Sequence, residues 1–279
     1  MGEFRRSLLW VGVCSLASVC AGASAQTQIQ TQTQTPIRAE VSVGAYYANG
    51  NFGAPTETTL AYLPVSLALE RGPWRAQLTA SRVAVEGAGN VLVNLGGVTQ
   101  AYPTLESSWR HSTGDTLLEL AYTLPEGVLS WLLGNAGADR LGLGLRATTK
   151  LPTASAEKGL GTGERDYSIQ LDASLPLGGQ LLFGSLGYTR RGESAVYSDI
   201  LSSPFAQLGI ARSVSERLSI GALYDYRQSA SSLYGDGQEL SVYGSLQIDP
   251  HWSVSGLVGA GLVSASSDLG VYVLVAYRW

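Results

Sequence analysis

The strict alternation of residues 268–279 is the feature that most constrains the fold. Leu269, Trp279 and every second residue between them are apolar or aromatic, so one face of an extended chain would be apolar throughout. The other face carries Asp268 and Arg278 near its two ends. Period-two alternation over this length predicts a β-strand and argues against a helix.

A closing strand with a terminal aromatic residue is typical of bacterial outer-membrane barrels. In those proteins the aromatic carboxyl end is the signal read by the barrel-assembly machinery. Tyr277 and Trp279 are therefore the expected assembly signal, although Phe is the usual last residue. The alternative for this stretch is a core strand of a soluble sandwich.

The first 25 residues have the organisation of a secretory signal peptide. Arg5 and Arg6 precede an apolar run, and residues 23–25 read Ala-Ser-Ala, so cleavage is expected before Gln26. Residues 26–36 are rich in Gln and Thr and are expected to be a disordered lead-in, since they bury too little apolar surface to order. The barrel would then comprise residues 37–279. A lipoprotein anchor at Cys20 is the alternative, but Val19 stands where a small residue is expected.

Composition narrows the class of protein further. Both cysteines lie within the first 25 residues, so the mature chain would have no disulfide and no Cys-based metal site. Charged residues make up only 14% of the chain, and no later stretch approaches the 18 apolar residues of a spanning helix. Loss of Glu3, Arg5 and Arg6 with the leader would change the net charge from -4 to -5. A chain of this charge offers no basic stripe for nucleic acid.

Alternating runs separated by turn signals predict an all-β, up-and-down antiparallel barrel that crosses the outer membrane. The expected connections alternate between short and long, which is the pattern of short periplasmic turns and longer external loops. Twelve strands are expected, at about 37–47, 59–70, 73–84, 114–124, 139–151, 165–176, 180–191, 204–213, 217–227, 238–248, 252–262 and 268–279. The long connection 125–138 is the exception and is expected to contain a short interfacial helix.

The polar faces of these strands contribute the candidate lumen-lining residues. Inside a narrow barrel such charges would either pair across strands to fill the lumen or line a wet path, and the sequence leaves both open. The candidates are Arg140, Arg146, Lys150, Asp166, Asp172, Arg217, Asp225, Arg227, Glu239 and Arg278. Aromatic residues near strand ends are expected to form girdles at the two lipid interfaces. Those residues are Tyr46, Tyr47, Tyr62, Trp74, Tyr122, Trp131, Tyr167, Tyr188, Tyr224, Tyr226, Trp252, Tyr277 and Trp279.

Catalytic and cofactor chemistry have weak support. His111 and Ser112 partly resemble the Ser–His pair of outer-membrane phospholipases, but neighbouring residues of a strand point to opposite faces. Residues 159–163 are Gly-rich, yet no helix follows them, so they lack the N-terminus that cradles a phosphate. His111 and His251 are the only histidines, which makes a metal site improbable. No catalytic residue, cofactor or metal is predicted.

The block from Lys150 to Asp172 carries a family resemblance. It contains Lys150-Leu-Pro-Thr, then Gly159-Leu-Gly-Thr-Gly163 and Asp166, and is similar to a signature of outer-membrane barrels named for the MetA pathway of phenol degradation. Before the fourth strand only Gly114 and Asp115 remain of that family's usual Gly-Leu-Gly-Asp turn. The resemblance implies a barrel that takes up small apolar or aromatic compounds and has no catalytic residues.

The sequence therefore predicts an outer-membrane channel or transporter for small hydrophobic or aromatic compounds. The expected partners are outer-membrane lipids, the barrel-assembly machinery and such a solute, and not nucleic acid. Two alternatives remain. One is a lipid or ester hydrolase that uses His111 and Ser112, and the other is a structural barrel with a plugged lumen.

Overall fold

The computed structural model describes residues 36–52, 57–87, 109–125, 141–195, 200–232 and 235–279, with the backbone of 92–94 and 97–99. The expected leader, nearly all of the lead-in and the expected interfacial helix at 125–138 lie outside these residues, apart from Pro36 and Pro125 at their edges. Within the described part, no helix is long and apolar enough to cross a membrane.

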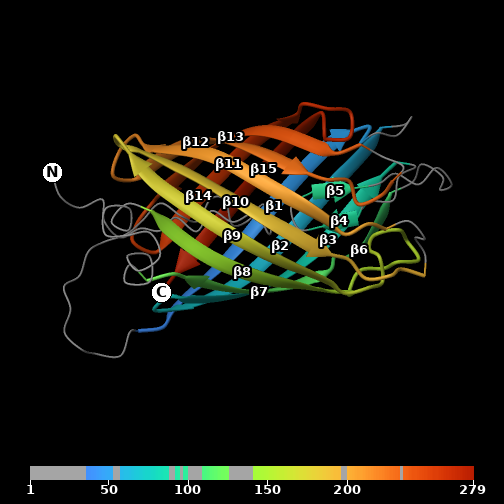
Figure 1. The fold of residues 1–279 in the computed structure, drawn as a ribbon, viewed down its shortest axis with the longest axis horizontal. Helices are drawn as coiled ribbons and strands as arrows, with labels where there is room; N and C mark the ends of the chain where they lie inside the picture. The colour runs from blue at the N-terminus through green and yellow to red at the C-terminus, as the bar shows by residue number, and fades with distance from the viewer. Residues whose placement is uncertain are drawn as a thin grey trace.

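The chain forms a closed antiparallel β-barrel (Figure 1). The barrel strands are β1 (Arg38–Gly50), β2 (Thr58–Arg71), β3 (Trp74–Glu86), β6 (Arg110–Thr113), β7 (Thr116–Thr123), β8 (Gly142–Leu151), β9 (Asp166–Leu177), β10 (Gln180–Arg190), β11 (Ser203–Ser213), β12 (Leu218–Arg227), β13 (Gly237–Gln247), β14 (Trp252–Gly261) and β15 (Leu269–Arg278). Strands β6 and β7 both pair with β3, so these strands fill twelve positions around the barrel. The predicted fold class and strand number are confirmed.

The barrel closes because β1 pairs with β2 on one side and with the last strand, β15, on the other. Glu40 is opposite Arg278 at one end of this seam, and Asn49 is opposite Leu269 at the other. A closed barrel leaves no strand edge with unpaired backbone groups, which is what a spanning sheet requires in lipid.

Side-chain burial distinguishes a membrane barrel from a sandwich. Along β2 the outward residues are apolar and exposed, for example Val65 and Leu67, whereas the inward Ser66 is buried. A soluble sandwich would bury the apolar face instead. An outer belt of exposed Leu, Val and Ile around the whole ring is therefore explained only by an apolar surrounding.

The connections at the two ends of the barrel differ in length. At the turn end, residues 72–73 and 178–179 join neighbouring strands directly. Gly72, Gly178 and Gly179 adopt positive φ there (59°, 56° and 84°), which other residues avoid. At the loop end the connections are longer, as in residues 152–165 and 191–202.

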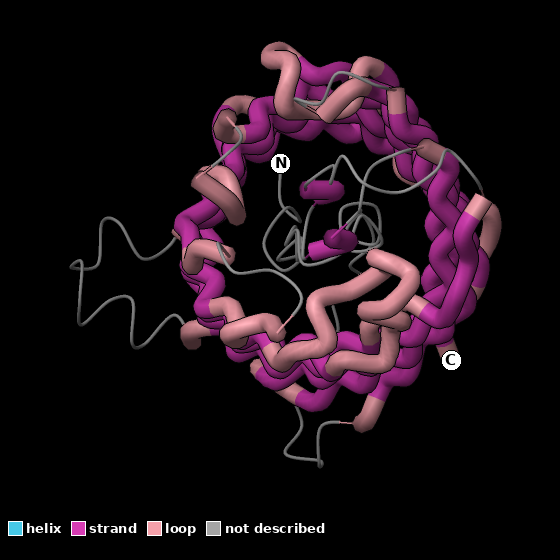
Figure 2. The backbone as a smooth tube through the Cα atoms, turned by 90° about the vertical axis from the view of Figure 1, so that its right-hand side faces the viewer, coloured by secondary structure: helices cyan, strands magenta, loops and turns pink. Residues whose placement is uncertain are grey.

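A short hairpin lies inside the ring of strands. Its strands are β4 (Leu92–Asn94) and β5 (Gly97–Thr99). Figure 1 places both within the length of the barrel toward the loop end, and Figure 2 places them inside the ring when the barrel is viewed along its axis. This hairpin, which belongs to the connection between β3 and β6, thus lies in the lumen.

One expected strand differs in detail. The strand expected at 114–124 is found as β7, but the strand position also contains β6, which was expected to be part of the preceding connection, and Gly114 and Asp115 separate the two. The backbone of Gly114 still bonds Ser81 of β3, with its N–H 2.9 Å from the carbonyl oxygen. The side chain of Asp115 bonds another segment, described below, which explains the interruption.

Candidate functional site in the barrel lumen

The inward face carries a repeated arrangement of one cation between two carboxylates, which we call a triad. Four triads occur among the described residues: Arg75 with Glu40 and Glu70, Arg146 with Glu119 and Asp172, Lys150 with Asp115 and Asp166, and Arg227 with Asp225 and Glu239. Buried charges are tolerated only when they are paired in this way, because removing an unpaired charge from water is costly.

The Lys150 triad lies at the loop end, where β8 ends and β9 begins. Lys150 Nζ is 3.2 Å from Asp115 Oδ2 and 3.0 Å from Asp166 Oδ2, and it donates to Thr162 Oγ1 at 2.8 Å. An ammonium group has three N–H donors, and three oxygens take them. Lys150 is 1% exposed, so it is wholly committed to holding these segments together.

The loop 152–165 is tied to the same place by its own backbone. The Ala154 N–H donates to Asp115 Oδ1 at 2.9 Å, and Thr153 Oγ1 donates to the Gly114 carbonyl at 2.8 Å. A Cβ on Gly161 would lie only 2.8 Å from the Cβ of Ala154, so only glycine fits there. These contacts use most of the signature residues, which gives the signature a structural role: it fixes this loop.

The loop also buries an apolar residue. Leu160 is 1% exposed and belongs to one buried apolar cluster with Val83 and Val85 of β3 and Leu60 of β2. Burial of a leucine contributes about 1.5–3 kcal/mol. The loop 152–165 is therefore fixed across the inside of the barrel mouth both by the Lys150 triad and by Leu160.

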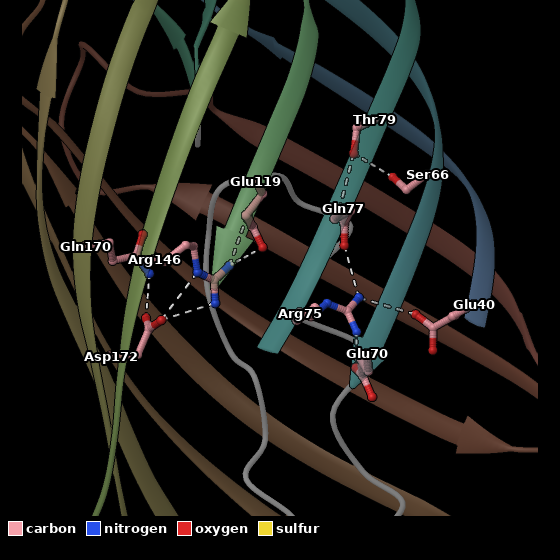
Figure 3. A network of polar contacts seen from close by, with 10 residues as sticks. All are labelled: Glu40, Ser66, Glu70, Arg75, Gln77, Thr79, Glu119, Arg146, Gln170 and Asp172. Atoms are coloured by element: carbon pink, nitrogen blue, oxygen red, sulfur yellow. Dashed lines mark hydrogen bonds and ion pairs between the residues drawn. The ribbon is translucent and has the colours of Figure 1, made fainter. Parts of the chain in front are cut away.

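The Arg146 triad lies near the middle of β8 (Figure 3). Arg146 Nη1 is 3.2 Å from Glu119 Oε1 of β7, and its Nε and Nη2 donate to Asp172 Oδ2 of β9 at 3.3 and 3.2 Å. Gln170 Nε2 donates to the other oxygen of Asp172 at 2.5 Å. The guanidinium thus joins three adjacent strands.

The Arg75 triad lies at the turn end and reaches the barrel seam. Arg75 pairs with Glu70 across the β2–β3 turn and is 3.6 Å from Glu40 Oε1 of β1. Glu40 Oε2 also accepts from Arg278 Nη2 at 2.6 Å. Figure 3 shows the polar row continuing from Arg75 through Gln77 along β3. One carboxylate therefore connects β1 to both β3 and β15.

A different surface covers the inward middle of β10–β15. Aromatic rings lie flat on this wall, each above a glycine of the neighbouring strand. A Cβ on Gly209 would lie 2.2 Å from the ring of Phe183, and one on Gly221 would lie 2.4 Å from the ring of Tyr243. Between and beside these rings lie Leu223, Leu257, Tyr272 and Leu274. The Arg227 triad adjoins this aromatic wall on β12 and β13, beginning two residues beyond Leu223.

The seam has the same ring-on-glycine arrangement twice. Tyr46 of β1 and Tyr272 of β15 are cross-strand partners with ring centroids 6.5 Å apart. Each ring covers a glycine of the opposite strand, Gly270 and Gly44 respectively. Tyr46 and Tyr62 were expected in a lipid-facing girdle, but both point inward and are buried. On each strand they fall on the same alternating positions as the inward polar residues.

Most of the predicted lumen-lining residues lie on the inward face. They are Arg146, Lys150, Asp166, Asp172, Asp225, Arg227, Glu239 and Arg278. Arg217 does not: it is exposed in the turn before β12, because that strand begins at Leu218. Arg140 lies outside the described residues.

Sequence reasoning missed five members of the triads: Glu40, Glu70, Arg75, Asp115 and Glu119. A signal was present for Glu119, which is the lone carboxylate of an apolar strand, Thr116–Thr123. A single charged residue on an otherwise apolar strand that crosses a membrane is expected to point inward, away from lipid.

The candidate catalytic pair is not assembled. His111 and Ser112 are consecutive residues of β6; His111 is exposed, and Ser112 has the opposite parity. Their side chains therefore leave opposite sides of the strand. In the described part of the chain, no three residues among His, Cys, Asp and Glu are grouped as metal ligands.

The expected assembly signal lies in an outward aromatic cluster at the turn end. The ring centroids of Tyr277 and Trp279 are 5.8 Å apart, and Trp252 lies 4.9 Å from Tyr277. Trp74 and Tyr122 form a second such pair at 4.6 Å. Rings of this kind fit the boundary between hydrocarbon and headgroups.

An apolar outer belt, a polar inner face and unequal ends define the class of the fold, the outer-membrane β-barrel. The solved structures that are similar to this chain include an outer membrane channel and a porin. The COG4313 outer membrane channel from Pseudomonas putida F1 is 12% identical, with a TM-score of 0.63 over 90% of this chain and 100% of that chain. The NanC porin is 10% identical, with a TM-score of 0.51 over 85% and 98%. No family model matches the sequence, and no curated protein matches it. The resemblance to the MetA-pathway barrels therefore stays a prediction.

Proposed function

We propose that the chain is an outer-membrane channel or transporter for small hydrophobic or aromatic compounds. The observation that carries this proposal is the aromatic wall inside the barrel, formed by residues such as Phe183, Leu223 and Tyr243. An apolar inner surface is unusual in a barrel whose lumen serves only water and ions. Sites for small organic molecules are mainly apolar with few polar groups.

The proposal includes the location and the route of assembly. The signal peptide at residues 1–25 would direct export, and the barrel-assembly machinery would read Tyr277 and Trp279. The apolar belt would then contact outer-membrane lipids. Support comes from the outward exposure of the belt and from the fold shared with an outer membrane channel.

The pairing of charges supports a path on which the cations of the triads are already occupied. In a porin that selects ions, charged side chains are free to interact with the solute. Here the cations are occupied by carboxylates of the same wall, as for Arg146 between Glu119 and Asp172. These charges stabilise the barrel, and the aromatic wall, whose rings are themselves largely buried, is the part of the inward face suited to an organic solute.

A structural barrel with a plugged lumen is the second candidate. Leu160 buries its side chain across the mouth, and the hairpin of β4 and β5 lies within the ring. Purified protein that folds but never conducts in planar bilayers, and that does not raise uptake in cells, would favour this candidate. The hydrolase alternative has no such support, because His111 and Ser112 lie on opposite faces.

Uptake by intact cells tests the proposal, because lipopolysaccharide slows the passive entry of apolar compounds. Expression in a Gram-negative host should raise the initial rate of uptake of radiolabelled toluene above that of the empty vector. Tyr243→Asn, on the aromatic wall, should lower this rate. The matched control is Val242→Asn, one residue away on the outward face, where 59% of the side chain is exposed. A correctly inserted barrel that leaves uptake at the vector level contradicts the proposal.

A further inference from the structure

We infer that the lumen discriminates against anionic solutes, so that the aromatic compounds it passes are neutral or cationic. This inference rests on the proposed function and adds the charge class of the substrate. Its basis is the composition and the geometry of the four triads.

The ion-paired groups of the inward face carry an excess of negative charge. Each triad has two carboxylates and one cation. Arg278, which shares Glu40 with Arg75, is the fifth cation. The ion pairs of the described strands therefore join eight carboxylates to five cations, an excess of three negative charges.

In five of the nine ion pairs among the described residues the carboxylate is the more exposed partner. In the Arg146 triad the cation side chain is 1% exposed and that of Asp172 is 15%. In the Arg75 triad the values are 9% for the cation and 30% for Glu70. In these two triads the cation lies behind a carboxylate, and the charge that a solute meets there is negative. The cation is the more exposed partner in three pairs: Arg278 at 30% against 8% for Glu40, Arg227 at 18% against 10% for Asp225, and Arg75 at 9% against 8% for Glu40.

The buried cations have few donors left for an anionic solute. The three donors of Lys150 are taken by Asp115, Asp166 and Thr162. Arg146 uses Nε, Nη1 and Nη2 on Glu119 and Asp172. A solute carboxylate would have to displace a protein carboxylate from either cation, and it would gain no new ion pair in exchange.

The excess extends along the barrel. Arg75 follows the β2–β3 turn, Arg146 lies midway along β8, and Lys150 lies near the loop end of that strand. A solute that moves along the aromatic wall passes each of these triads in turn. A path lined by an excess of charge of one sign enriches counter-ions and depletes ions of the same sign.

Planar-bilayer recording with three matched probes tests the inference. The mature protein is reconstituted, and the reversal potential is measured in a KCl gradient. In two further recordings, potassium is replaced by benzylammonium, and chloride is replaced by benzoate. Benzyl alcohol is the neutral probe, and its binding is measured by the block of the current. Potassium should be preferred over chloride by about tenfold, the lower end of such enrichment. Benzylammonium should carry current, benzoate should not, and benzyl alcohol should reduce the potassium current.

Variants assign the preference to the triads. Glu70→Gln and, independently, Glu239→Gln should each lower the preference for potassium, because these carboxylates are 30% and 20% exposed. Glu216→Gln is the matched control, since Glu216 is exposed in the turn between β11 and β12 and should leave selectivity unchanged.

The outcomes separate the two proposals. Equal or greater permeability to chloride and benzoate overturns the inference while leaving a channel in place. Folded protein that neither conducts nor raises toluene uptake overturns the proposed function, and the inference is lost with it.

Discussion

The loop-end and turn-end triads place the same charges in different roles. At the loop end, Lys150 and Thr162 are 12 residues apart, and the triad fixes one loop across the mouth. At the turn end, Glu40 and Arg278 are 238 residues apart, and the contact joins the first strand to the last. The loop-end triad thus anchors one loop. The turn-end triad joins the first strand to the last, because its Glu40 also binds Arg278.

The two regions also differ in the number of ion-pair partners that each charged group has. Lys150 is almost fully buried and is the cation that Asp115 and Asp166 share, while a backbone N–H also donates to each carboxylate. At the turn end Glu40 has two cations, and Arg75 has a second carboxylate in Glu70. Removing one member should therefore be more costly at the loop end than at the turn end.

Lys150→Met should have the largest effect. It removes the ammonium group that the buried carboxylates of Asp115 and Asp166 share, and losing one partner of a buried pair costs about 3–5 kcal/mol. The free energy of unfolding from lipid vesicles in urea measures this. Trypsin should also cut the released loop at Lys158 or Arg165. Lys158→Met, at an exposed position, is the control, and equal stability of the two variants would contradict the loop-anchor role.

Glu40→Gln should have a smaller effect on the free energy of unfolding, about 1.5–3 kcal/mol, the range for a hydrogen bond to a charged group. Arg75 keeps Glu70, so only Arg278 loses its carboxylate. A double-mutant cycle with Arg278→Met isolates the seam contact. Independent, additive effects of the two changes would show that the seam contact contributes nothing.

Gly221→Ala should destabilise the aromatic wall by about 1–2 kcal/mol, within the range for overpacking. The added methyl group would lie 2.4 Å from the ring of Tyr243 and 2.6 Å from the carbonyl oxygen of Ile210. Gly244→Ala is the matched control, because its nearest neighbour would lie 3.8 Å away. The difference between the two unfolding midpoints is the readout. If both variants unfold like wild type, the ring does not cover Gly221.

The smallest effect is expected in a turn outside the barrel. The backbone N–H groups of Trp252 and His251 donate to Asp249, and they hold the pKa of this carboxylate below its usual value. Its contribution to stability is therefore present above the ordinary carboxylate pKa and is lost as the pH falls through the lowered pKa. Asp249→Ala should unfold slightly earlier than wild type at neutral pH, and the gap should close in acid. A gap that does not change with pH would contradict this.

Local patterns predicted the strands but not what joins them. The alternation of residues 165–176 is sufficient to expect β9 at Asp166–Leu177, because period two needs only neighbouring residues. The break at Asp115 could not be predicted, since it depends on Lys150 and Ala154, which meet it only in the folded barrel. The rings above Gly209 and Gly221 likewise follow from strand register, which alternation alone does not give.

The most direct test of the lipid-facing assignment is spin labelling along β2. Both cysteines of the chain lie in the first 25 residues, so single-cysteine variants of the mature barrel each carry one nitroxide. The outward positions are Leu63, Val65, Leu67 and Leu69, which are 52%, 50%, 40% and 45% exposed. The inward controls are Ser66 and Ala68, both buried.

Power saturation compares collisions with oxygen, which dissolves in lipid, and with a water-soluble nickel chelate. The barrel predicts that labels at the four outward positions collide preferentially with oxygen and that labels at the two inward positions do not, giving a period of two residues. Equal accessibility at all six positions, or a preference for the nickel chelate at the outward ones, would contradict a lipid-facing outer belt.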